Sequence, residues 1–267
     1  MSALLRANIL TDFAFYRRSR LLLAFTLVAL LLTGLSTLPV LFSGSSVQSF
    51  RSLQQVFSVL NDMLLFLAGA IGLLVISSHL RSRCLKMVFT KPCSPGAWLA
   101  SAFLSAVLIS LSLNALILGG SVILSFVWHV PVRAALVFLS AENFVVSIGI
   151  IAYLILLATL LHPALAVIFI LIFNAEMFYS FYTWTQGAIR AGDSSFYLRV
   201  FEKLFHFFYL LLPMVNPFEK QLEGVSTSMR IAHGEWKYLV YSLGYVLVLS
   251  AFCYFVALFT LQRKRHI

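Results

Sequence analysis

The chain has 267 residues, of which 61% are hydrophobic and only 10% are charged. A soluble domain usually has about 45–50% apolar and about 25% charged residues, and it could not hide so much apolar surface. The composition therefore excludes a soluble enzyme, a disordered chain and a disulfide scaffold, and it predicts a protein that crosses a membrane several times. The formal charge of +10 would suggest nucleic acid as the partner of a soluble protein, but in a membrane protein it indicates orientation instead.

The N-terminal segment, residues 1–20, places Leu5, Ile9 and Phe13 on one side of a helix, with arginines towards its end. This pattern predicts a helix that lies on the cytoplasmic membrane surface; the alternative is a frayed basic tail. The apolar run that follows, about 21–42, is longer than the 7–15-residue core of a cleaved signal peptide. We therefore expect it to be retained as a membrane span.

Six segments of the chain are long enough to cross a hydrocarbon core about 30 Å thick, which requires about 20 helical residues. They cover residues 21–42, 57–80, 98–127, 141–161, 164–184 and 238–261. The stretch Pro131–Ser140 is either a short interfacial elbow or an extension of the fourth span that would bury Glu142. The expected fold class is an all-α integral membrane protein, with residues 1–267 forming a single transmembrane domain.

The basic residues give the orientation of the spans. More than half of the 19 Lys and Arg residues lie in short segments before the first span, between the second and third, and after the last. Short loops that are rich in Lys and Arg stay in the cytoplasm. We therefore expect both termini and the 81–97 loop to face the cytoplasm, and residues 185–237 to face outward.

The 81–97 loop reads RSRCLKMVFTKPCSPGA, in which cations surround a short apolar run. An ordinary cytoplasmic loop explains the cations. It does not explain the apolar run, which suggests a helix that docks into a groove of a partner protein. The candidate docking residues are Arg81, Arg83, Lys86, Met87, Val88, Phe89 and Lys91.

The outer segment contains a helical pattern from Ser194 to Leu212, which Pro213 ends. Its polar residues form one narrow stripe, Arg199, Glu202, Lys203 and His206, and every other side is apolar. So wide an apolar surface predicts a helix that dips into the outer leaflet or packs against the spans, with Arg199 and Glu202 paired. The candidate gate residues at the outer mouth are Arg199, Glu202, Leu204, Phe205 and Phe208.

Polar residues inside the spans are candidates for a transport path, because an ionisable group in the bilayer is costly and is commonly functional. They are Asp62, Asn114, Asn174 and Glu176. The alternative is a structural role, as a protonated carboxyl or a hydrogen bond between helices. That alternative is favoured for Asp62, about 9 Å into its span and so near the membrane surface, whereas for Glu176 both stay open.

Motifs of catalysis are missing from the sequence. It has no H-E-x-x-H, no G-x-S-x-G, no Cys/His cluster with ligand spacing and no G-x-x-x-x-G-K-[ST]. We therefore expect no enzyme activity, cofactor or metal in this chain. Two alternatives remain: a membrane enzyme that uses Asp62, Glu142 and Glu176, and an ion-coupled carrier, which would usually show an internal repeat.

Two stretches resemble the permease subunits of ATP-binding-cassette (ABC) transporters of the type-2 exporter class. HLRSRCLKMVFTKPCSPGAWLASAF, His79 to Phe103, is similar to the family's span-end arginine, apolar stretch, Lys-Pro step and start of the next span. LLPMVNPF, Leu211 to Phe218, is similar to the proline-broken stretch before the family's last helix. The chain departs from the family where Ser82-Arg83-Cys84 replaces the usual acidic residue and glycine.

The resemblance implies a permease in the cytoplasmic (inner) membrane of a bacterium. Its partners would be two separate ABC ATPase subunits, which hold the ATP and Mg, a second copy of this chain or a homologue, and membrane lipids. The 81–97 loop and the N-terminal helix would transmit closure of the ATPase dimer to the spans. No nucleic acid would be bound. The substrate class stays open between lipids, glycans, peptides and drug-like molecules.

Overall fold

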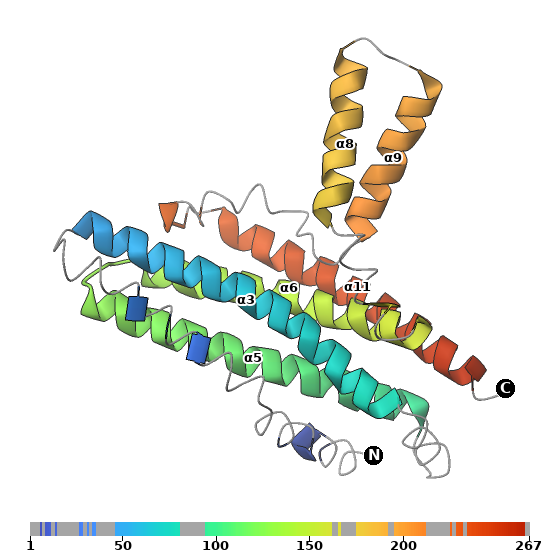
Figure 1. Ribbon diagram of the computed structural model, residues 1–267, viewed down its shortest axis with the longest axis horizontal. Coiled ribbons are helices and arrows are strands. Elements are labelled where there is room, and N and C mark those ends of the chain that lie inside the picture. Colours follow the sequence, from blue (N-terminus) through green and yellow to red (C-terminus); the bar gives the residue numbers. More distant parts are fainter. Residues whose placement is uncertain are drawn as a thin grey trace.

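The computed structural model shows an all-helical protein in the part of the chain that it describes (Figure 1). The described residues are 6, 9–11, 14, 27, 28, 31, 34, 35, 46–80, 94–161, 165, 166, 175–191, 195–211, 225, 228–231 and 234–264. The main helices are α3 (Ser46–Leu80), α5 (Pro95–Val127), α6 (Arg133–Leu160), α8 (Ala175–Arg190), α9 (Phe196–Leu211) and α11 (Glu235–Lys264).

Four of these helices, α3, α5, α6 and α11, are long and apolar enough to cross a membrane. The candidate spans are Ser49–Leu73, Pro95–Val127, Arg133–Leu160 and Glu235–Arg263. The chain is thus a helical, multi-pass membrane protein, as its composition predicts. The predicted interfacial helix, the first span and the first half of the fifth span lie almost wholly outside the described residues.

Helix α3 begins well before the second predicted span, which was placed at 57–80. Arg51 and its neighbouring glutamines made this region resemble a loop in the sequence. Leu53, Val56 and Phe57 nevertheless fall at helical spacing, and all three are buried against the other helices. Their burial extends the helix into a polar stretch, because tertiary packing outweighs local composition.

Helix α6 begins at Arg133, so the fourth span is extended and the interfacial elbow is not formed. Leu136 and Phe138 are fully buried in its first turns, which explains why the helix starts directly after Pro131 and Val132. The turn before it is closed by Ser125, whose Oγ donates to the Val130 carbonyl at 2.6 Å. Glu142 consequently lies inside a candidate span.

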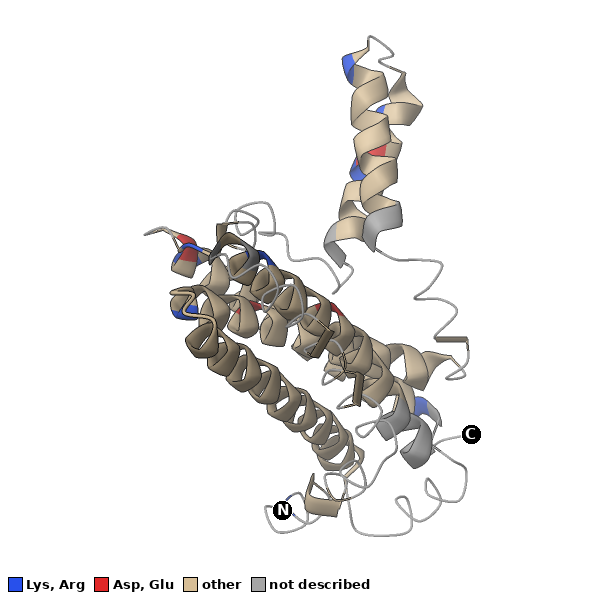
Figure 2. Ribbon diagram, turned by 60° about the vertical axis from the view of Figure 1, so that its left-hand side comes forward, with Lys and Arg blue, Asp and Glu red and all other residues tan. Residues whose placement is uncertain are grey.

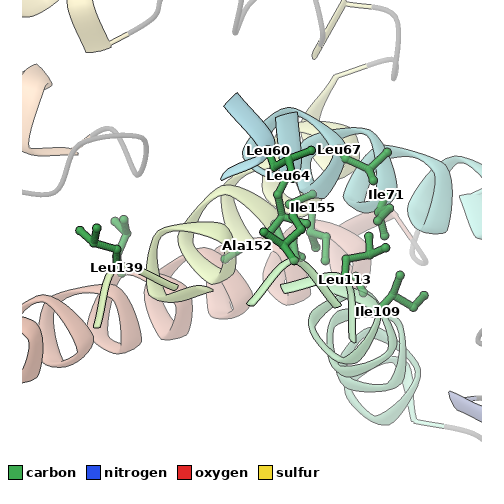
Figure 3. Packing of buried hydrophobic residues seen from close by; sticks show 14 of the residues in the cluster. Leu60, Leu64, Leu67, Ile71, Ile109, Leu113, Leu139, Ala152 and Ile155 are labelled. Atoms are coloured by element: carbon green, nitrogen blue, oxygen red, sulfur yellow. The ribbon is translucent and has the colours of Figure 1, made fainter. Parts of the chain in front are cut away.

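Helix α6 is the centre of the described bundle. It packs against α3, α5 and α11. In the most apolar 18-residue stretch of α6, 78% is buried, whereas in the corresponding stretch of α11 only 28% is buried. Figure 3 shows the layer in which side chains of α3, α5 and α6 meet. The labelled residues of this layer are Leu60, Leu64, Leu67, Ile71, Ile109, Leu113, Ala152 and Ile155.

The contacts between α3 and α6 show that these helices run in the same direction. Asn143 of α6 donates to the Asn61 side chain at 3.2 Å. Further along both helices, Gly72 faces Ile151, and a Cβ added at Gly72 would lie 3.6 Å from the Ile151 Cα. A glycine allows this close approach of two backbones, which is a frequent device where helices meet in membranes.

Helix α11 is also parallel to α6, whereas α5 is antiparallel to it. The Phe138 ring contacts the Trp236 ring near the start of both α6 and α11, and Val246 clusters with Val145 and Ile148 further along. In α5 the order is reversed: Ser110 bonds Ser147, while Asn114 bonds the earlier Ser140.

The parallel course of α6 and α11 constrains the chain between them. Helix α6 ends at Leu160, at the end of the bundle opposite to the one where α11 begins at Glu235 (Figure 1). The two helix ends that flank residues 161–234 therefore lie at opposite ends of the bundle.

Helices α8 and α9 form a separate antiparallel hairpin, which stands away from the four long helices in both views (Figures 1 and 2). They pack extensively against each other. At about 1.5 Å per residue each helix is about 24 Å long, which is shorter than a full membrane crossing.

Candidate functional site

Several residues that the sequence singles out lie outside the described part of the chain. The candidate docking residues, Arg81 to Lys91, all belong to this group, and so does Asn174. Glu176 lies in the first turn of α8, but its side chain is not described. The roles proposed for these residues stay predictions.

Asn114 lies buried between α5 and α6, with 4% of its surface exposed. Its side-chain Nδ2 donates to the Ser140 carbonyl at 3.0 Å, and its Oδ1 accepts from the Ser140 hydroxyl. Both polar ends of the amide are therefore engaged by the neighbouring helix. In this position Asn114 joins α5 to α6.

Asp62 lies in α3, which is longer than a single membrane crossing. Asp62 is about 27 Å along the helix axis from Leu80, where α3 ends, and a hydrocarbon core is about 30 Å thick. Its side chain is exposed on the surface of the bundle. The depth of Asp62 in the membrane therefore stays a prediction.

The neighbouring Asn61 fixes this part of α3. It accepts a hydrogen bond from Asn143 of α6, so Asn61 points into the bundle while Asp62 points out of it. Glu142, next to Asn143 on α6, is half-buried and has an interaction of its own.

The exposed side of α3 carries further polar residues that sequence reasoning missed. Within the candidate span its exposed residues are Arg51, Gln55, Ser58, Val59, Asp62 and Phe66. We call Arg51, Gln55, Ser58 and Asp62 the α3 polar stripe. Their spacing of four, three and four residues places them on one side of a helix. The spacing is visible in the sequence, but the predicted span begins at residue 57.

The hairpin joins α8 to α9 through four pairs of rings, two of them stacked and two tilted. The pairs are Phe178 with Phe208, Tyr179 with Tyr209, Phe181 with Phe205 and Tyr182 with His206, with ring centroids 4.8–5.6 Å apart. The aromatic side chains thus form a continuous ladder between the two helices, and such pairs are favourable beyond the area that they bury.

A polar contact accompanies this ladder. The Gln186 Nε2 donates to the Tyr182 hydroxyl at 2.7 Å and to Glu202 at 3.3 Å. Glu202 therefore faces α8, and in the described hairpin no ion pair joins it to Arg199, contrary to the expectation from their spacing.

The outer sides of the hairpin are apolar and uncovered. The exposed large apolar residues are Phe181, Trp184, Phe196, Tyr197, Val200, Phe201, Leu204, Phe207 and Phe208. A hairpin with a polar contact inside and aromatic rings outside cannot be stable in water by itself. Lipid or another protein surface must cover it.

No group of three or more His, Cys, Asp or Glu that could hold a metal ion is present among the described residues. A comparison with protein-family models finds no match, and comparisons with curated proteins and with solved structures find none either. The family resemblance therefore depends on the two sequence stretches alone.

Proposed function

We propose that the chain is the six-span permease subunit of an ABC exporter, driven by separate ATPase subunits. The observation that carries this proposal is the parallel course of α6 and α11. If both helices cross the membrane, Leu160 and Glu235 lie on opposite sides of it. The chain between them must then cross an odd number of times, which supports the fifth predicted span at 164–184. With the first span this would make six crossings, so both termini would lie on the same side, and the Lys and Arg residues of the short segments favour the cytoplasm as that side.

The hairpin supports a membrane-dipping helix before the last span. Phe205 and Phe208 of α9 pair with Phe181 and Phe178 of α8, and these α8 residues belong to the fifth predicted span. If α8 lies in the outer leaflet, α9 must lie beside it at the same depth. Its exposed rings would then contact lipid or the second permease, and α9 would act as a gate at the outer mouth.

The energy source is proposed to be outside this chain. The two ATPase subunits would bind ATP and Mg, and the apolar run of the 81–97 loop would dock into a groove on one of them. Closure of the ATPase dimer would favour one global arrangement of the spans over another, which opens a path between two permeases. In this scheme the permease performs no covalent chemistry.

The docking role can be tested with Phe89→Asp, because this change places a charge in an apolar socket at a cost of about 2–4 kcal/mol. The tagged chain is purified from its native membranes, and a Walker-motif ATPase should co-purify with it. Phe89→Asp should lose the ATPase or its coupling to transport, whereas Phe89→Leu should retain both. Unchanged co-purification and unchanged transport in Phe89→Asp would reject the docking role.

A further inference from the structure

The turn between α5 and α6 marks one surface of the membrane. Both helices are candidate spans, and the turn that joins them, Trp128 to Val132, exposes His129 and Pro131. Irregular backbone that faces lipid does not occur inside a hydrocarbon core, so this turn lies outside it. Helix α6 has 28 residues and is therefore about 42 Å long, which matches the thickness of about 40–45 Å of a bilayer with its headgroup layers. Arg133, the first residue of α6, consequently lies at the level of the headgroups.

The Arg133 side chain is held by an aromatic ring. Its guanidinium carbon Cζ lies 3.7 Å from the centroid of the Phe126 ring of α5, and both side chains are exposed. An arginine over an aromatic ring is stabilised by a cation–π interaction, which uses the face of the guanidinium and leaves the N–H groups at its edge available. No ion pair to Arg133 is found within the described ranges. These N–H groups can therefore bind an anion, and phosphate fits their geometry.

The surface on the membrane side of Arg133 is apolar. Val137 lies one helical turn further along α6, and Ile123 lies about one turn before Phe126 on α5, which runs in the opposite direction. Both are therefore deeper in the membrane than the Arg133–Phe126 pair, and they are 45% and 64% exposed. A phospholipid has its phosphate and its acyl chains in this same order. The arrangement thus fits a lipid better than a free phosphate ion, which would leave the apolar surface uncovered.

The charge at this end of the bundle favours a lipid with a negative headgroup. Arg51 of α3 and Arg133 of α6 each lie ten residues before the hydrogen bond that joins the two helices, so both lie about 15 Å from it towards the same end. Arg230 and Lys237, before and at the start of α11, are exposed at this end as well (Figure 2). The adjacent Glu235 offsets only one of these charges. The resulting positive field attracts anionic lipids.

We propose that Arg133 and Phe126 form a binding site for an anionic phospholipid. The Arg133 guanidinium binds the phosphate, and the acyl chains lie along Ile123 and Val137. This inference requires only that the bundle crosses a membrane. It does not depend on the permease function.

The test measures which lipids surround the site. The full chain, with Cys84, Cys93 and Cys253 replaced and a fluorophore attached through Val137→Cys, is reconstituted in phosphatidylcholine vesicles. Spin-labelled phosphatidylglycerol or spin-labelled phosphatidylcholine is then added, with the same label on the acyl chain, and the quenching of the fluorophore is compared. Phosphatidylglycerol should reach half of its maximal quenching at an about fivefold lower concentration, the factor that one cation near the membrane surface contributes. Ile123→Cys is a second reporter if Val137→Cys does not accumulate.

Variants and controls identify the residue that is responsible. Arg133→Gln should abolish the preference for phosphatidylglycerol, whereas Arg133→Lys should retain part of it, because the charge remains but the planar N–H edge is lost. Arg230→Gln is the matched control: it removes the same charge at the same end of the bundle and should change the preference little. A reporter at Val248→Cys on α11, which is 72% exposed, should show no preference. Replacement of chloride by inorganic phosphate at equal ionic strength should leave the preference unchanged.

Three results would overturn the inference. Equal quenching by the two lipids in the chain with Arg133 intact would show that no selective site exists. A preference that survives Arg133→Gln would come from the overall charge of this end. A preference that inorganic phosphate abolishes would assign the site to a free anion. The co-purification of an ATPase, which tests the permease function, is independent of all three results.

Discussion

The four-helix bundle and the α8–α9 hairpin both place polar contacts between helices, but they cover their apolar side chains differently. In the bundle, α6 is surrounded by α3, α5 and α11, and residues such as Leu136 and Phe138 are fully buried. In the hairpin, two helices meet through a ladder of rings, and rings such as Phe196 and Phe207 stay exposed. The bundle therefore supplies its own core.

The difference follows from the number of packed helices. A helix with apolar residues on most of its surface requires neighbours on several sides, and a two-helix hairpin provides only one. The stability of the bundle should consequently depend on internal packing. That of the hairpin should depend on the medium or the protein that covers it.

The largest effect is expected for Phe138→Ala in the bundle. Phe138 is fully buried, and its ring contacts Trp236 edge-on with centroids 4.9 Å apart. Removing it should lower the free energy of unfolding by about 3–5 kcal/mol, through lost contacts and a cavity. Phe66→Ala is the matched control, because Phe66 is 78% exposed on α3 and should have little effect. Unfolding in mixed micelles measures both; equal losses would contradict the assignment of the core.

A smaller effect is expected for Phe208→Asp in the hairpin. Phe208 is 39% exposed and contacts Phe178, so a carboxylate there would face the covering lipid or protein. A charge costs about 2.5–3.5 kcal/mol at the centre of a span, and the yield of folded protein should fall.

The control for Phe208→Asp is Lys203→Gln, on the exposed polar side of α9. This control should change the free energy of unfolding by about 0–1 kcal/mol. Spin labels at Phe205 and Phe208 should report contact with lipid or protein. Free aqueous exposure at both positions would show that the hairpin is an ordinary external loop.

Much of the bundle could be predicted from the sequence, because a long apolar run has few alternatives to a membrane helix. The third and sixth spans were placed within a few residues of α5 and α11, and α9 was recognised from the narrow stripe of polar residues around Glu202.

The helix starts that lie before the predicted span starts share one cause. At the start of α3 and α6, polar residues such as Arg51 and Arg133 made the sequence resemble loops, whereas buried partners such as Leu53 and Leu136 extend the helices. Partners on other helices are invisible in a sequence without knowledge of the fold. For the same reason the α3 polar stripe was divided between a predicted loop and a predicted span.

The smallest effect distinguishes two kinds of buried polar group within the bundle. The Asn114 amide bonds Ser140 across the α5–α6 contact, while the Ser242 hydroxyl of α11 is buried without a hydrogen-bond partner among the described residues. Hydrogen bonds between membrane helices contribute about 0.6 kcal/mol on average and at most about 1.7, so Asn114→Ala should destabilise the bundle by an amount in this range. Ser242→Ala removes an unsatisfied group and should leave stability unchanged or raise it slightly. Unfolding of both variants in the same micelles gives the comparison, and a larger loss for Ser242→Ala would mean that its hydroxyl has a partner in the assembled protein.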